Sequence, residues 1–182
     1  MDNKAHKSIE ERVALFRRYY AMENERPLLG FFLGSEYPLH QYPASRGLPE
    51  DRPIAIYTGS LLRGKGVEYA LEAMRLLGQG KRTASLFFVF VGYPEAPVAA
   101  FVDRHRLFDQ CRVAGEVAYD RLPVWLAAAD MALEPKAAAG GEASGKLLHY
   151  MAAGLPVVGF DTAANRSMLG DLGFWAPRGD AQ

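Results

Sequence analysis

The sequence predicts an α/β protein built on a Rossmann-like, doubly wound parallel sheet. From Pro53 onward, short runs rich in β-branched and aromatic residues alternate with segments whose apolar residues recur at helical spacing. One run, "LFFVFVG" at 86–92, is apolar throughout, as is typical of a strand covered on both faces. Strands that alternate with helices pair in parallel through right-handed crossovers. We therefore expect one such domain over 53–182.

The first half of this pattern begins with "IAIYT" at 54–58, a short β-rich run that ends at Gly59. The segment 65–78 carries apolar residues at helical spacing and ends at Gly78, which predicts a helix with a glycine stop. The expected elements that follow are a strand at 86–92, a polar helix at 95–107 and a strand, "CRVAG", at 111–115.

The second half repeats the alternation. "SGKLLHYMAAG" at 144–154 predicts a helix closed by Gly154, and "LPVVGF" at 155–160 predicts the strand after it. The other expected elements are a short helix at 121–130, a strand at 131–135, and a helix with a last strand within 164–177.

Residues 1–52 do not follow this pattern. They contain a candidate amphipathic helix, a candidate strand and a Pro-rich loop. We treat them as an N-terminal segment of no assigned affiliation.

The amino-acid composition argues against several classes of partner and site. The 182 residues carry 21 basic and 21 acidic side chains, which argues against nucleic acid as a partner. The lone Cys111 excludes an internal disulfide and a cysteine zinc site, and His6, His40 and His105 lack partners at metal-ligand spacing. No secretory signal and no apolar run of transmembrane length is found, so we expect a cytoplasmic location.

The stretch "AAAGGEASGKLLHYMAAGLPVV" at 137–158 contains G-x-x-x-x-G-K, the start of a phosphate-binding loop. Such a loop needs Ser or Thr after the lysine to ligate magnesium, and Leu147 follows Lys146 here. Asp161 could imitate the acidic strand end of a nucleotide hydrolase. For this stretch we keep two alternatives: a nucleotide hydrolase, and a Gly-rich connection that binds no ligand.

Four motifs explain more residues. They are "YTGSLLRGKGVEYALEAM", "FVFVGYPE", "VAGEVAYDRLPVWLAAADMALEP" and "SGKLLHYMAAGLPVVGFDT", in this order. Their succession over about 53–176 resembles the C-terminal, donor-binding domain of the group-one (family 4) retaining glycosyltransferases, in which two Rossmann-like domains face a cleft, the GT-B architecture. The resemblance implies a nucleotide-diphosphate sugar as substrate, transfer of a hexose with retention, and neither a cofactor nor a metal.

The first motif implies a turn that binds the donor diphosphate. Gly59 and Gly66 allow backbone to approach a ligand closely at a strand-to-helix turn. The family pattern is G-R-L-x-x-x-K-G; Lys65 matches its lysine, and Ser60 stands in the arginine position. Arg63 could supply some of the missing charge. The alternative for Lys65 is a solvated lysine at a helix start.

The last motif implies a second phosphate contact. We expect Ser144 to cap the helix, with free amides at Gly145 and Lys146 that face a phosphate, aided by the helix dipole. By the same resemblance, Gly92 follows its strand where the family often places a glycine near the sugar.

The resemblance also exposes a departure. Family members carry two glutamates eight positions apart, and the alignment puts these at Gly141 and His149; Glu142 lies one residue away. Neutral imidazole offers one acceptor where a carboxylate accepts two hydroxyls, and the lost contact costs about 1–3 kcal/mol. We expect weakened donor binding. The alternatives are a helix histidine without a ligand and a degenerate domain that acts as an interaction module.

Four further residues have expected places in this comparison. Glu116 and Tyr119 lie near where the family stacks the base, and a plain surface loop is the alternative. Trp125 is expected in the core, and Asp130 at a helix-to-strand junction. Residues 1–52 are too few for the family's second Rossmann-like unit, which binds the acceptor. We therefore expect a truncated product, a domain joined to an unrelated N-terminus, or a chain that acts with a separate acceptor-binding chain or as a homo-oligomer.

Overall fold

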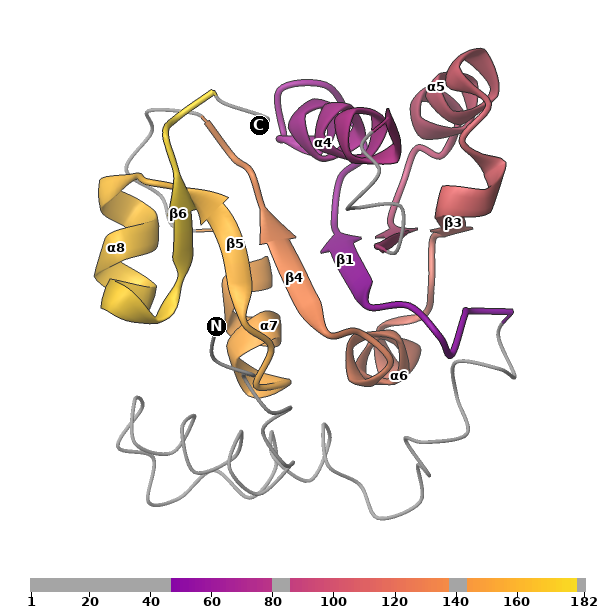
Figure 1. Cartoon of the computed structure of the whole chain (residues 1–182). Helices are drawn as coiled ribbons and strands as arrows, with labels where there is room; N and C mark the ends of the chain where they lie inside the picture. The colour runs from indigo at the N-terminus through magenta and orange to yellow at the C-terminus, as the bar shows by residue number, and fades with distance from the viewer. Residues whose placement is uncertain (1–46, 80–85, 138–143, 180–182) are drawn as a thin grey trace.

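A parallel sheet with the strand order β3-β2-β1-β4-β5-β6 runs through the described part of the chain (Figure 1). The computed structural model describes residues 47–79, 86–137 and 144–179. All neighbouring strands in these residues pair in parallel. This is the strand order of a doubly wound Rossmann-like fold, which confirms the predicted fold class.

The strands are β1 (Ile54–Thr58), β2 (Phe87–Val91), β3 (Cys111–Gly115), β4 (Met131–Glu134), β5 (Val157–Phe160) and β6 (Phe174–Ala176). The helices are α4 (Val67–Gln79), α5 (Ala96–His105), α6 (Leu122–Ala127), α7 (Lys146–Ala152) and α8 (Ala163–Leu169). Short 3-10 turns are η2 (Phe108–Gln110), η3 (Tyr119–Arg121) and η4 (Gly170–Leu172). None of the helices within the described ranges has the length and apolar character needed to cross a bilayer.

The sheet has an apolar core on each face. Every residue of β1 and β2 is buried, because α4 and α5 cover one face while α6 and α7 cover the other (Figure 1). Ile56 and Trp125 belong to the core under α6 and α7, so the predicted core position of Trp125 is confirmed. Tyr57 and Phe90 belong to the core under α4 and α5. Residues alternate between the two faces along each strand.

Asp130 fixes the start of β1. Its Oδ2 accepts a hydrogen bond from the Ile54 amide at 2.7 Å, and its own amide donates to the Ile54 carbonyl at 2.9 Å. The predicted structural role of Asp130 at the helix-to-strand junction is therefore confirmed.

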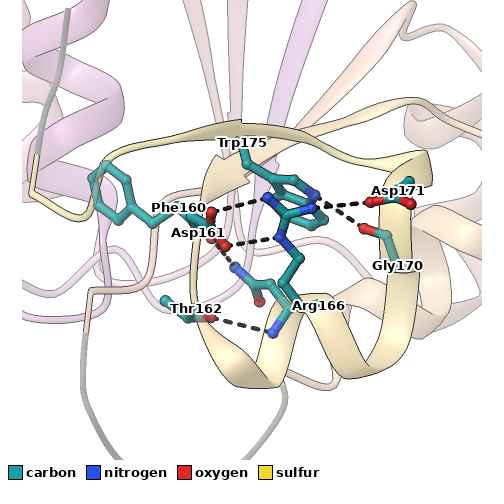
Figure 2. Close-up of polar contacts among 8 residues, drawn as sticks. Phe160, Asp161, Thr162, Arg166, Gly170, Asp171 and Trp175 are labelled. Atoms are coloured by element: carbon teal, nitrogen blue, oxygen red, sulfur yellow. Dashed lines mark hydrogen bonds and ion pairs between the residues drawn. The ribbon is translucent and has the colours of Figure 1, made fainter.

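Arg166 on α8 joins the segments around β5 and β6 at the edge of the sheet (Figure 2). Its Nε and Nη2 donate to the two oxygens of Asp161 at 2.8 and 2.9 Å, and its Nη1 donates to Asp171 Oδ1 at 3.1 Å. The guanidinium lies 5.6 Å from the centre of the Trp175 ring. The Trp175 indole in turn donates to the Gly170 carbonyl at 3.0 Å. The Asp161 carboxylate is thus occupied by a bidentate arginine.

Candidate functional site

The carboxyl ends of β1, β2 and β3 are joined by backbone hydrogen bonds. The Gly59 amide donates to the Val91 carbonyl at 2.9 Å, and the Gly92 amide donates to the Gly115 carbonyl at 2.8 Å. Between β1 and β4 the strand order reverses, and ligands of open α/β sheets bind at such a switch point. The structure therefore brings Gly59 and Gly92 together at the edge where a ligand is expected.

Gly92 is held in a conformation that only glycine adopts without strain. Its φ is +147°, and a Cβ built on it would lie 1.7 Å from the carbonyl oxygen of Gly59. Gly59 itself has a φ of +113°. The two backbones pack against each other directly, so a side chain at residue 92 would separate the ends of β1 and β2.

The loop between β1 and α4 is tied from the inside by Tyr57. Its hydroxyl lies 3.0 Å from the carbonyl oxygens of both Ser60 and Lys65. Burial raises the pKa of Tyr57, so the hydroxyl stays a donor. The Arg63 and Lys65 side chains are exposed, and neither forms an ion pair with another described residue. The two predicted cations therefore lie on a loop whose backbone is fixed and whose charges face solvent.

Gly66 brings this loop against the end of β4. Gly66 has a φ of +99°, and there is no room for a side chain on it. A Cβ there would lie 2.5 Å from the Pro135 carbonyl oxygen and 3.0 Å from the Lys136 amide nitrogen. Any side chain at residue 66 would push the two loops apart. The predicted close approach at Gly66 is thus made to a neighbouring loop of the protein.

Lys146 points into the protein. Its Nζ lies 3.2 Å from Oε2 of Glu134 and 3.9 Å from the centre of the Tyr57 ring. The Lys146 side chain is 12% exposed and that of Glu134 is 0% exposed. Burial lowers the pKa of Lys146, the Glu134 carboxylate opposes this, and the positive charge of Lys136 lowers it further. The sequence does not predict Glu134 and Tyr57 as site residues, because its pattern identifies them only as parts of strands.

The expected helix cap at Ser144 is wrong. Helix α7 begins at Lys146, its N-cap position belongs to Gly145, and no side chain caps it. Ser144 contributes its backbone carbonyl, which accepts from the Leu147 amide at 2.9 Å. The chain turns into the helix through backbone bonds alone. Phosphate binding at Ser144, Gly145 and Lys146 stays a prediction.

His149 pairs with Tyr119. The Tyr119 hydroxyl lies 3.0 Å from His149 Nε2, and the two rings meet edge-on with centres 5.6 Å apart. Tyr119 is 61% exposed, and burial lowers the pKa of His149, which favours neutral imidazole. Two residues that the sequence analysis considered separately thus form one polar pair at the surface.

Tyr150 holds α7 on the sheet beside this pair. Its hydroxyl accepts from the Thr58 amide at 2.9 Å and lies 3.2 Å from Thr58 Oγ1 and 3.3 Å from the Leu133 carbonyl oxygen. Its side chain is fully buried, which raises its pKa and keeps the phenol protonated. One hydroxyl therefore links α7 with the ends of β1 and β4.

Two of the predicted residues, Gly141 and Glu142, lie outside the described residues. For the phosphate-loop alternative, Lys146 is engaged by Glu134 and Asp161 by Arg166, so neither is free for the role which that alternative requires. Across 47–79, 86–137 and 144–179, no three His, Cys, Asp or Glu side chains lie together where they could hold a metal ion.

Comparison with known families gives one match. The family described as "Glycosyl transferases group 1" matches residues 52–182. No curated protein matches the chain.

Solved structures share the fold. Sucrose-phosphate synthase from Thermosynechococcus elongatus is 22% identical, with a TM-score of 0.64 over 84% of this chain and 38% of that one. Alr3699/HepE from Anabaena, solved with UDP and glucose, is 18% identical, with a TM-score of 0.65 over 79% of this chain and 39% of that one. The chain thus spans about two fifths of these two proteins.

A third structure is a single domain of comparable extent. It is the C-terminal domain of a glycosyl transferase group 1 family protein, LpcC, from Francisella tularensis. It is 19% identical, with a TM-score of 0.61 over 81% of this chain and 77% of that domain. Because the family match covers most of the chain and the strand order agrees with it, the chain belongs to the group 1 glycosyl transferases.

Proposed function

We propose that this chain binds a nucleotide-diphosphate sugar at the carboxyl edge of its sheet, as the donor-binding part of a glycosyltransferase. The observation that carries the proposal is the meeting of the loops at Gly59, Gly66 and Gly92 at the switch point of the sheet. A Cβ at Gly59 or Gly64 would meet nothing within 4 Å, so a ligand has room to approach the backbone of the loop between β1 and α4 at this edge.

The diphosphate is assigned to the loop between β1 and α4. Arg63 and Lys65 are exposed there and lack an acidic partner among the described residues. Unpaired cations on a fixed backbone favour a phosphate group, because each forms a charge-assisted hydrogen bond with it. Ser60, in the position of the family arginine, contributes no charge, so Arg63 is the proposed replacement.

The nucleoside is assigned to the Tyr119–His149 pair. Nε2 of His149 lies next to the Tyr119 hydroxyl, and neutral imidazole has one acceptor nitrogen for hydroxyl groups. A carboxylate at this position would accept two such bonds, and the missing one weakens binding by about 1–3 kcal/mol. Tyr119 is 61% exposed, and we assign the stacking of the base to its ring.

The proposed reaction is the transfer of a hexose to an acceptor with retention of configuration. Support comes from the family and from the Anabaena relative, whose structure contains UDP and glucose. Transfer needs an acceptor-binding partner, which we propose to be a separate chain or a second copy of this one. No cofactor or metal is part of the proposal, and the proposed location is the cytoplasm.

Isothermal titration of the full chain with UDP-glucose, GDP-glucose and ADP-glucose tests donor binding. We expect one of the three to bind with a Kd in the micromolar to millimolar range, because one carboxylate contact is missing. Absence of heat with all three donors at millimolar concentration would overturn the proposal.

A second candidate function is an interaction module whose donor site has degenerated. Ser60 and His149 favour it, because each replaces a charged residue of the family pattern. His149→Glu distinguishes the two: a gain of about tenfold in donor affinity indicates an intact pocket with one weakened contact. An unchanged affinity near the detection limit indicates that the pocket has been lost.

A further inference from the structure

Lys65 and Lys136 belong to two backbone segments that contact each other. Lys65 precedes Gly66, and a Cβ at Gly66 would lie 3.0 Å from the amide nitrogen of Lys136. The contact therefore places the loop before α4 and the loop after β4 side by side. Lys136 is half-buried, in contrast to the exposed Lys65.

The acidic groups nearby are already engaged. Oε2 of Glu134 pairs with Lys146 at 3.2 Å, and Oε1 of Glu68 accepts from the Gly64 amide at 2.8 Å. Within the residues that the structure describes, neither Lys65 nor Lys136 takes part in an ion pair. The junction thus holds two positive charges that these carboxylates do not neutralise.

The charge of Lys136 also reaches the buried pair behind it. The positive charge of Lys136 adds to the lowering of the Lys146 pKa, so the Lys136 charge lies within electrostatic reach of the buried pair. The loops of Lys65 and Lys136 meet at the edge of the sheet where ligands bind, and an anion bound there offsets the positive charge of both residues. A diphosphate has the charge and the number of oxygens to bridge two ammonium groups.

We propose that Lys136 is a second phosphate-binding cation, which acts with Lys65 on the phosphoanhydride of the ligand. This rests on the proposed function, since it assigns a further residue to the same site. Lys146 acts behind it as a positioning residue: its ammonium contacts Tyr57, whose hydroxyl holds the loop of Lys65.

Calorimetric titration of the full chain with inorganic pyrophosphate and with UDP-glucose tests the proposal. Lys136→Met removes the charge and keeps the length of the side chain, whereas Lys136→Arg keeps the charge. Arg104→Met is the matched control, because Arg104 is an exposed cation in the last turn of α5, outside the junction. Thermal unfolding of each variant shows whether it is folded.

We expect Lys136→Met to weaken both pyrophosphate and UDP-glucose by about tenfold, a typical effect of losing one charge-assisted contact. Lys136→Arg and Arg104→Met should stay within about twofold of the wild type. Wild-type affinity for pyrophosphate in Lys136→Met would overturn the inference, as would an equal loss in Arg104→Met or absence of pyrophosphate binding by the wild type.

Failure of this inference and failure of the proposed function give different results. If UDP-glucose binds equally to wild type and Lys136→Met, the role of Lys136 is wrong and donor binding stands. If pyrophosphate binds in a Lys136-dependent way but no nucleotide sugar binds, the anion site stands and the proposed function is wrong.

Discussion

His149 is the residue at which the site departs most clearly from its family. In the structure it is half-buried and pairs with the Tyr119 hydroxyl. The pair replaces the charged acceptor of the family by a neutral imidazole. We therefore interpret His149 as part of a weakened nucleoside contact. This interpretation depends on the imidazole being neutral.

The neutrality of His149 has a consequence for stability. Burial lowers its pKa below that of a solvated histidine, so the unfolded chain binds the proton at higher pH than the folded chain does. The stability that the neutral ring contributes is present at high pH and is lost as the pH falls below about 6.5. We predict that the free energy of unfolding decreases on going from about pH 7.5 to about pH 5.5.

Urea unfolding of wild type and His149→Gln at these two values measures the effect. The variant cannot take up the proton, so its decrease should be smaller than that of the wild type. Equal decreases in both proteins would contradict a lowered pKa at His149.

Among the elements, β4 and α7 are joined by a buried ion pair. Lys146 and Glu134 form an ion pair at 3.2 Å, and no other described residue forms a hydrogen bond with Oε1 of Glu134. A buried pair of this kind adds little net stability, because desolvation offsets the attraction. Removing one partner is costly, because a charge is then left in the core.

We predict that Lys146→Met lowers the free energy of unfolding by about 3–5 kcal/mol. The double variant Lys146→Met/Glu134→Gln should recover a large part of this loss, because it leaves no buried charge. Chemical denaturation of the wild type, both single variants and the double variant measures the coupling. A loss below about 1 kcal/mol in Lys146→Met would show that the carboxylate finds water or another partner.

The elements themselves could be predicted from the sequence, because their signals are local. Strands β1 and β2 are buried on both faces, and their continuous apolar runs are typical of such strands. The start of α7 was not predicted correctly: Ser144 is the better capping residue by type, but the helix begins after Gly145. Backbone bonds decide that boundary.

The side-chain contacts that shape the site could not be predicted from local sequence patterns. Tyr57 and Tyr150 resemble ordinary core aromatics in the sequence. In the structure the Tyr57 hydroxyl holds the loop between β1 and α4, and the Tyr150 hydroxyl joins α7 to the end of β1. Glu134 carries no signal except a carboxylate at the end of an apolar strand. Only the packing of α7 on the sheet brings Lys146 to it.

At the scale of the whole molecule, a chain without net charge gathers cations at one edge of its sheet. Lys65, Lys136 and Lys146 belong to loops or helix starts that follow β1 and β4. An anionic ligand is the simplest complement to this distribution. Because the chain spans 38% of one relative and 39% of another, the acceptor and the transfer step are proposals about an assembly larger than this domain.

At the scale of the whole domain, we propose that a nucleotide-diphosphate sugar binds at the carboxyl edge of the sheet. Amide chemical shifts of ¹⁵N-labelled protein during titration with UDP-glucose test it most directly. We expect saturable shifts at Gly59, Lys65 and Gly92, and none at Arg104 on α5. Shifts confined to other surfaces, or none at millimolar ligand, would contradict it.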